Sequence, residues 1–174
     1  MTIPSGTASH RAEGDALAAL RCAIVTVTDT RTVDNDESGA AIKRLIEAAG
    51  HQMADYTLLP NNEARVRGQV RALAARGDVD VVLLTGGTGL GTKDRTVEAV
   101  RSVIEKELPG FGELFRMVSF QEQVGTAAIL SRAVAGSAGG KLIVSMPGSK
   151  AAVELALTRI LLPELRHAIR ELRR

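Results

Sequence analysis

The sequence predicts an α/β domain built around a mainly parallel β-sheet. Short runs rich in Val, Ile and Leu, typical of strands buried on both faces, alternate along the chain with amphipathic helical segments. This alternation is the pattern of a parallel sheet with helices packed against it. The 174 residues are enough for one domain with a hydrophobic core and few for two. We therefore expect residues 20–174 to form a single domain.

Four segments have the composition of strands, and five have the periodicity of helices. The expected strands are residues 21–29, 51–60, 78–87 and 141–149. The expected helices are residues 38–50, 61–77, 96–108, 111–123 and 150–174. The intervening segment GTAAILSRAVAGSAGG is expected to combine a short helix with small residues.

Two of the expected helices have a clear inward face. In the first we expect Ala41, Leu45 and Ala48 to share one face, with Gly50 ending the helix. The second helix directs its arginines outward, and its expected inward residues are Val66, Val70 and Leu73.

The second half of the chain carries further local signals. Thr96 has the residue type of a helix N-cap, and Glu98 suits the positive end of the helix dipole. Pro109-Gly110 is expected to end that helix. Phe111 and Phe115 stand four positions apart, so we expect them to pack as a core pair.

The last helix is expected to be interrupted or bent at Pro163, because proline lacks the backbone N–H of a helix interior. Its arginines complement the helix C-terminal dipole and are expected to form a solvated face without a function of their own. They are Arg166, Arg170, Arg173 and Arg174.

Composition argues against a nucleic-acid-binding or membrane protein. Lys and Arg number 22 against 20 Asp and Glu, and the resulting net charge of +2 is too small to indicate an anionic partner surface. Aromatic residues make up 2% of the chain, which nearly excludes base-stacking platforms. No stretch approaches the ~20 apolar residues of a membrane span. The N-terminus lacks a signal-peptide pattern, so we expect a cytoplasmic protein with a mobile tail at residues 1–19. The stretch GDALAALR, residues 14–21, is expected to add a short helical turn.

Cysteine and histidine offer little chemistry. The single cysteine, Cys22, lies in the apolar run CAIVTV and is expected to be a small buried hydrophobe. His10, His51 and His167 have no spacing typical of a metal site or of a catalytic base.

Three polar or glycine-rich segments each follow an expected strand. They are TDTRTVDNDESG, TGGTGLGTKD and MPGSK. Ligands of parallel sheets bind at the carboxyl ends of the strands, so we expect these segments to meet at one edge.

The segment LLTGGTGLGTKDRT, residues 83–96, is the first candidate for chemistry. Its four glycines lie within six positions after a strand, where successive backbone N–H groups suit a phosphate-like anion. It does not match the P-loop, because Gly91 is followed by Thr92-Lys93. It does not match the dinucleotide fingerprint, because Thr92 stands where the glycine after Gly87-Thr88-Gly89 is required. The alternative is a tight turn without a ligand. Lys93 and Asp94 favour a function, because a cation offsets phosphate charge and a carboxylate beside phosphate suits Mg²⁺ or a substrate donor.

The acid-rich loop after the first strand is the second candidate. Its acidic residues are Asp29, Asp34, Asp36 and Glu37. Helix caps and solvated surface are the commoner roles for such residues, and Asp29 is the exception because it directly follows a buried strand. The turn MPGSK is weak alone and counts only because the topology brings it to the same edge.

Four short motifs occur in order between residues 21 and 165. They are TGGTG followed by D-x-T-x-E-A, then PGFGELFRMVSF, AILSRAVAG and MPGS-K-A. Four motifs in this order and spacing are specific, and through them the chain resembles the MoaB/MogA molybdenum cofactor biosynthesis family, most closely its MoaB branch.

The resemblance implies a three-layer α/β/α domain, assembled as a trimer or as a hexamer made of two trimers. It implies molybdopterin, a pterin dithiolene with a terminal phosphate, as the ligand. Active family members adenylylate that phosphate with Mg-ATP and release pyrophosphate. Molybdopterin, ATP and Mg²⁺ are therefore the small-molecule partners that the resemblance implies.

The resemblance also implies a site. Asp94 matches the family's catalytic aspartate and would orient Mg²⁺ or the substrate, while Asn61 and Glu63 are candidates for a second catalytic position. Lys93 would offset phosphate charge. The expected substrate-binding residues are Asp29, Ser38, Gly39, Thr85, Gly86, Gly87, Thr88, Gly89, Lys93, Ser131, Pro147, Gly148 and Ser149.

The chain departs from the family pattern at the catalytic pair. Adenylylating members carry a second aspartate directly after the proline that follows the second strand, whereas here Pro60 is followed by NNE. An asparagine oxygen can bind a metal but brings no negative charge. Lys93 stands where arginine is usual, and Arg95 and Val97 replace a usual valine and proline.

Three functions are therefore open. The first is a molybdopterin adenylyltransferase, and the second is a non-catalytic molybdopterin-binding or assembly protein that keeps the pocket and the trimer. The third is a phosphate-binding α/β protein of another pathway.

Overall fold

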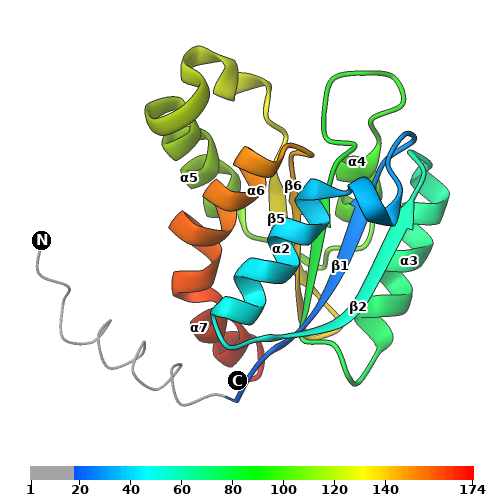
Figure 1. Ribbon diagram of the computed structural model, residues 1–174. Helices are drawn as coiled ribbons and strands as arrows, with labels where there is room; N and C mark the ends of the chain where they lie inside the picture. The colour runs from blue at the N-terminus through cyan, green and yellow to red at the C-terminus, as the bar shows by residue number, and fades with distance from the viewer. Residues whose placement is uncertain (1–17) are drawn as a thin grey trace, which may run out of the picture.

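The computed structural model of the chain describes residues 18–174, and Figure 1 shows a central sheet with helices on both faces. The strands are β1 (Arg21–Val27), β2 (Gln52–Leu59), β3 (Val81–Thr85), β4 (Lys106–Glu107), β5 (Val134–Ala138) and β6 (Lys141–Met146). The α-helices are α2 (Glu37–Ala48), α3 (Glu63–Ala75), α4 (Thr96–Arg101), α5 (Pro109–Ser119), α6 (Lys150–Ala156) and α7 (Leu162–Leu172). Two 3-10 helices, η1 (Val33–Asn35) and η3 (Gly125–Leu130), and two π-helical segments, η2 (Phe120–Val124) and η4 (Leu157–Leu161), complete the described elements.

Residues 1–17 of the predicted tail, with His10 and the start of the predicted helical turn, lie outside the described residues. The described end of that stretch is not helical: residues 18–20 have no regular structure, and Arg21 begins β1. No helix among residues 18–174 is long and apolar enough to cross a membrane.

The six strands have the order β2-β1-β3-β6-β5-β4. The pairs β1–β2, β1–β3 and β3–β6 are parallel, whereas β5–β6 and β4–β5 are antiparallel. The prediction of a mainly parallel α/β sheet is therefore confirmed. The antiparallel edge is formed by two strands that the sequence pattern did not reveal.

The helices form one layer on each face of the sheet, which confirms the three-layer α/β/α fold. Figure 1 shows α3 and α4 on one face, and α2, α5, α6 and α7 on the other. Alternate residues of β1 point to opposite faces: Cys22 and Ile24 join the core under α2 and α7, whereas Ala23 and Val25 join the core under α3. Burial on both faces explains why the strand is a continuous apolar run.

The helix predicted for residues 96–108 is wrong in its length and in its cap. It begins after Arg95 and ends at Arg101, and Pro109 opens α5 in place of ending the preceding helix. The residues after Arg101 pair with β5 and do not continue the helix. The N–H of Glu105 donates to the Ser137 carbonyl at 2.8 Å, and the N–H of Leu108 donates to the Ala135 carbonyl at 2.7 Å. Proline suits the first turn of a helix, where its missing N–H costs nothing.

The segment predicted to hold a short helix and small residues also forms a strand. Its first part is η3, and its second part is β5, whose sequence VAGSA pairs with β6 through a hairpin at Gly139-Gly140. Both turn glycines have positive φ, 57° and 71°, as tight hairpin turns require. Small residues in β5 concealed the strand, and Gly136 is needed because a Cβ there would lie 2.5 Å from Ile104.

Most other local predictions are confirmed. Phe111 and Phe115 are buried with ring centroids 6.2 Å apart, and Cys22 is buried, which raises the pKa of its thiol to about 12. The last helix is interrupted by η4 just before Pro163. In α2, however, Ile42 and Ile46 provide the buried face, and the prediction for Ala48 is wrong because that residue is exposed.

The C-terminal arginines are not all solvated as predicted. Arg173 donates to Oδ1 of the buried Asp80 at 2.7 Å, and Arg21 pairs with the same carboxylate at 2.9 Å. Arg166 is half-buried. The C-terminal end of the last helix is therefore attached to the start of β3. This end of the sheet lies opposite to the polar loops that follow the strands.

Candidate functional site

The three polar segments that follow β1, β3 and β6 meet at one edge of the sheet, as the sequence predicts. The Thr85 hydroxyl at the end of β3 donates to the Pro147 carbonyl at 2.9 Å. The Ser38 hydroxyl lies 3.1 Å from the Gly148 carbonyl, although the two residues are 110 positions apart. These contacts join the starts of α2 and α6 across the end of β3.

We call residues 86–94 the glycine loop. Its first two glycines are required by the packing of the chain around them. Gly86 and Gly87 have φ of 94° and 64°, in the region that favours glycine. A Cβ on Gly86 would lie 2.2 Å from the Val27 carbonyl, and one on Gly87 would lie 2.4 Å from Oδ1 of Asn61. The bare backbone therefore allows the loop to pass directly over the end of β1.

Two cavities open on either side of this loop. The larger, of about 660 Å³, lies among the glycine loop, the end of α5, η2, η3 and the start of α6. The smaller, of about 510 Å³, lies beside the loop that leads from β1 to α2. Four small residues line both cavities and form the ridge between them. They are Gly86, Gly87, Gly148 and Ser149.

The structure gathers most of the sequence-predicted site residues around these cavities. Besides the ridge, those lining the larger cavity are Thr88, Gly89, Asp94, Ser131 and Pro147. Those lining the smaller cavity are Asp29, Ser38, Asn61 and Thr85.

Three predicted residues do not line either cavity. Glu63 accepts a hydrogen bond from Nε of Arg95 at 3.1 Å, and its other oxygen lies 3.5 Å from Arg67. Lys93 is exposed. Gly39 has a packing role, because a Cβ there would lie 2.2 Å from Oδ2 of the Asp36 carboxylate.

Asp94 presents a carboxylate to the larger cavity. It is half-buried, and its side chain accepts no hydrogen bond from the described residues. A Cβ on Gly89 or Gly91 would lie 2.7 or 2.9 Å from Oδ2 of Asp94, so the loop curls tightly around this side chain. An open carboxylate at a cavity wall suits a cation or a substrate donor.

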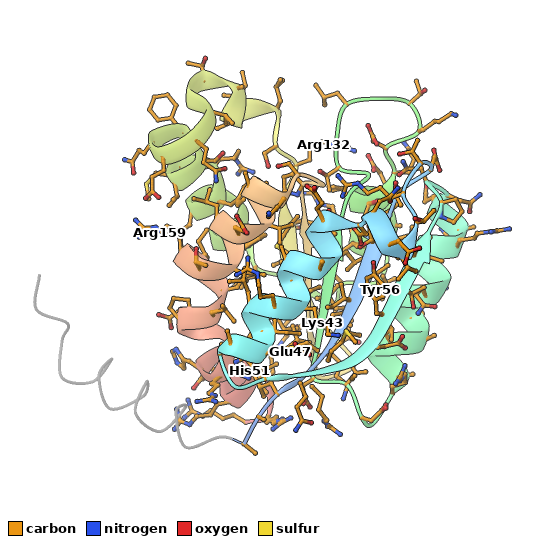
Figure 2. The ribbon with its side chains drawn as sticks, viewed as in Figure 1. Lys43, Glu47, His51, Tyr56, Arg132 and Arg159 are labelled. Carbon is orange, nitrogen blue, oxygen red and sulfur yellow. The ribbon has the colours of Figure 1, made fainter. Side chains whose placement is uncertain are left out.

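Arg132 holds the glycine loop, a role that the sequence analysis missed. Its Nε donates to the carbonyl of Thr88 at 3.0 Å, and Nη2 donates to the carbonyl of Asp94 at 2.7 Å. Nη1 pairs with Glu98 at 2.6 Å, and this contact lowers the pKa of the Glu98 carboxyl. Figure 2 shows Arg132 beside the loop, close to the ends of the strands. Only the presence of arginine in the motif AILSRAVAG could have drawn attention to it.

A buried carboxylate, Asp36, organises the wall of the smaller cavity. Its Oδ2 accepts hydrogen bonds from Thr26 and Tyr56, both at 2.6 Å, and its Oδ1 caps α2 by accepting from the N–H of Gly39 at 3.1 Å. Burial alone would raise the pKa of Asp36, but these hydrogen bonds outweigh it and keep the pKa below its ordinary value. Burial and the bond to Asp36 raise the pKa of the Tyr56 phenol.

Several buried polar atoms around the glycine loop lack a hydrogen-bond partner among the described residues. They are Oδ1 of Asn61, Oγ1 of Thr96 and Oγ of Ser131. A buried polar group without a partner costs about 1–3 kcal/mol. Ser131 is among the residues of the larger cavity and Asn61 among those of the smaller, so these buried unsatisfied atoms lie in the walls behind both cavities.

The donor set fits a magnesium ion that arrives with a nucleotide. The described residues contain no group of three or more His, Cys, Asp and Glu side chains placed to hold a metal by themselves. Mg²⁺ is usually held through one or two carboxylates together with substrate phosphates. Asp94 can supply the carboxylate, and the Asn61 amide oxygen is neutral.

Comparison with known proteins places the chain among molybdenum cofactor proteins. A family model described as a probable molybdopterin binding domain matches residues 23–167. Molybdenum cofactor biosynthesis protein B of Halalkalibacterium halodurans is 53% identical over 163 residues, which cover 94% of this chain and 95% of that protein.

Solved structures agree with the sequence comparison. A crystal structure of a molybdenum cofactor biosynthesis protein B superposes with a TM-score of 0.88 at 46% identity, covering 91% of this chain and 98% of the other. The tungsten cofactor synthesizing protein MoaB from Pyrococcus furiosus superposes with a TM-score of 0.81 at 32% identity, covering 91% and 100% of the two chains.

Proposed function

Because this chain belongs to the molybdenum cofactor biosynthesis family that carries the probable molybdopterin binding domain, we propose that it binds molybdopterin in the paired cavities. The observation that carries this proposal is the ridge of Gly86, Gly87, Gly148 and Ser149, which lines both cavities. A ligand with a planar ring system and a phosphate needs a roomy apolar wall beside a polar one. The larger cavity offers Phe115 and Leu130, and the smaller offers threonine, serine and asparagine side chains.

We further propose that the bound molybdopterin is adenylylated with Mg-ATP. An oxygen of the molybdopterin phosphate attacks the α-phosphorus of ATP, and a new P–O–P linkage forms. The bond between the α-phosphorus and the oxygen that bridges it to the β-phosphate breaks, and pyrophosphate leaves with that electron pair. A phosphate dianion needs no general base for this attack, so the protein contributes mainly position and charge stabilisation.

The residues of the glycine loop fit such a role. The backbone at Gly86–Gly89 can approach a phosphate closely, because no side chain stands in the way. Asp94 would orient the metal-bound or donor group, and Arg132 holds the backbone of Asp94 in place. When bound with ATP, Mg²⁺ would neutralise phosphate charge.

A second candidate is a molybdopterin-binding protein without transferase activity, and the geometry of position 61 favours it. The Asn61 amide replaces a carboxylate in the family pattern. A Cβ on Gly87 would lie 2.4 Å from Oδ1 of Asn61 and 2.2 Å from Oγ1 of Thr96. The Asn61 oxygen is therefore directed against the glycine loop and has a reduced capacity to hold a cation.

Adenylyl transfer by the purified full chain is the direct test. Freshly prepared molybdopterin and Mg-ATP labelled in its α-phosphate would be incubated with the protein, and AMP incorporation and pyrophosphate release would be measured together. Equal amounts of both products support the transferase. Tight molybdopterin binding without either product supports the non-catalytic binder. A chain that binds neither molybdopterin nor ATP contradicts both proposals.

We also propose that the chain forms a trimer or hexamer, as its family resemblance implies. A run of large apolar side chains about half-exposed on α5 and η2 supports an interface there. They are Leu114, Met117, Phe120 and Val124. Light scattering should give a trimer or hexamer mass at micromolar concentration, and a monomer would contradict the proposal.

A further inference from the structure

The two cavities are unevenly supplied with charge. Of the described residues that line either cavity, Arg31 alone carries a positive charge, and it belongs to the smaller one. Asp94 and Asp29 carry negative charges, one in each cavity. Phosphate groups bound here therefore have one cationic side chain available. Lys93, which the sequence suggested for this role, lines neither cavity.

Arg31 is held in the cavity wall by buried partners. Its Nη1 lies 3.3 Å from Oδ1 of Asp36 and also donates to the Ser38 hydroxyl. Its backbone N–H donates to the Thr28 hydroxyl at 3.1 Å, which fixes the start of the side chain. Asp36 is itself held by Thr26 and Tyr56, and Figure 2 shows Tyr56 on β2 beside β1. The guanidinium is thus oriented before any ligand arrives.

Most of the hydrogen-bonding capacity of Arg31 is still available. A guanidinium has five N–H donors in a rigid plane, and within the described residues neither Nε nor Nη2 makes a hydrogen bond. The side chain is 35% exposed, so these donors are accessible to a ligand. A fixed guanidinium with one edge available matches the oxygen pair of a phosphate.

We propose that Arg31 binds a phosphate group of the substrate in the smaller cavity, with Asp36 acting as its positioning residue. The inference rests on the proposed function and adds a residue that determines specificity for phosphate monoesters or polyphosphates. Asp36 balances much of the positive charge of Arg31. The contribution of Arg31 is therefore mainly a pair of directed hydrogen bonds to phosphate oxygens, and lysine cannot supply that pair in the same plane.

The test measures binding of three probes by calorimetry, each without turnover. Inorganic pyrophosphate reports the phosphate site alone, ATP without magnesium reports the nucleotide, and molybdopterin without ATP reports the pterin phosphate. The variants are Arg31→Gln and Arg31→Lys. Arg71→Gln is the matched control, because Arg71 is exposed on α3 and lines neither cavity.

Arg31→Gln should weaken the probe whose phosphate occupies the site by about tenfold to a hundredfold, as expected for a charge-assisted hydrogen-bond pair. Arg31→Lys should weaken it by a smaller factor, because charge remains while the paired geometry is lost. The probe that loses affinity identifies the source of the phosphate, ATP or molybdopterin. Arg71→Gln should bind every probe as the unaltered chain does.

Thermal unfolding of each variant separates binding from folding, and Arg31→Lys remains decisive if Arg31→Gln is poorly folded. Unchanged affinity for all three probes in a folded Arg31 variant would overturn the inference and leave the proposed function intact. An unaltered chain that binds pyrophosphate through Arg31 but neither ATP nor molybdopterin would support the phosphate site and contradict the proposed function.

Discussion

The guanidinium of Arg132 donates a 2.7 Å hydrogen bond to the backbone carbonyl of Asp94, from a position 38 residues further along the chain. The same side chain also holds the Thr88 carbonyl and the Glu98 carboxylate. One side chain is thus hydrogen-bonded to both ends of the glycine loop and to the first turn of α4. The Asp94 backbone is restrained from two sides, because its carbonyl accepts from Arg132 and its N–H donates to the Gly91 carbonyl at 3.0 Å.

Replacing Arg132 with alanine should loosen the glycine loop and leave the sheet intact. Loss of these hydrogen bonds to a charged donor should lower the free energy of unfolding by about 1–3 kcal/mol. Amide hydrogen exchange in residues 88–94 should become faster, while exchange in β1 and β3 should follow only the change in global stability.

Arg159→Ala is the control for this experiment, because Arg159 also pairs with one glutamate, Glu122, at 2.5 Å, but on the surface. Its loss should change stability by about 0–1 kcal/mol. Figure 2 shows Arg159 on the helical layer, away from the glycine loop. Unchanged exchange in residues 88–94 of Arg132→Ala would show that Arg132 does not restrain the loop.

Gly87→Ala should destabilise the protein and weaken ligand binding. The added Cβ would require positive φ and would lie within 2.4 Å of Asn61 and Thr96, so a loss of about 1–3 kcal/mol is expected. Chemical denaturation measures this loss, and calorimetry with molybdopterin measures the binding.

Gly68→Ala provides the matched control within the same chain. Gly68 lies in α3, and a Cβ there meets nothing within 4 Å. The substitution should therefore stabilise the helix by about 0.5–1 kcal/mol. Equal effects of the two substitutions would mean that the turn tolerates a side chain.

Asn61→Asp should distinguish an impaired transferase from a binding protein. It restores the carboxylate of the family pattern beside the glycine loop, where it can contribute charge to a metal site. If the chain is a weak adenylyltransferase, the rate of AMP incorporation should rise by about tenfold or more. No change in rate, with molybdopterin binding retained, would favour the non-catalytic binder.

Asp94→Ala should abolish any adenylyl transfer and leave the fold unchanged. The Asp94 carboxylate accepts no hydrogen bond from the described residues, so its removal leaves no buried partner unsatisfied. The thermal midpoint should stay close to that of the unaltered chain while AMP incorporation disappears. A large fall in the midpoint would instead make Asp94 a structural residue.

Asp80→Asn should reduce stability in a manner that depends on pH. Burial would raise the pKa of Asp80, but hydrogen bonds from Arg21 and the charge of Arg173 lower it below the ordinary value. A carboxyl whose pKa is lower in the folded state stabilises the fold above its unfolded pKa of about 3.9, and this stability is lost as pH falls through the folded pKa.

The free-energy difference between the unaltered chain and Asp80→Asn should therefore be constant from pH 7 to about 5, and should shrink below about 4. Because both arginines are more than a third exposed, we expect a difference of about 1–2 kcal/mol at pH 7. Urea denaturation at pH 7 and 3.5 measures it. A difference that grows as the pH falls would contradict the assignment.

The hydrophobic pattern predicted the strands that are buried on both faces, because such strands need continuous apolar runs whatever lies around them. Residues 21–27, 81–85 and 141–146 are the clearest cases. The pattern failed for β4 and β5, whose short or small-residue sequences become strands only through pairing with neighbours. It also extended α4 too far, because local propensity is weaker than that pairing.

The sequence by itself determined the alternation of strands and helices that gives a mainly parallel sheet, the edge where the polar loops meet, and the motifs that indicate the family. Only the tertiary structure decided which side chains reach that edge. It placed Arg31 in the smaller cavity and left Lys93 exposed outside both cavities, and it brought Arg132 to Asp94 and Tyr56 to Asp36. Periodicity reports only neighbours within a few positions, whereas these contacts join residues 20 and 38 positions apart, whose approach depends on how the layers pack.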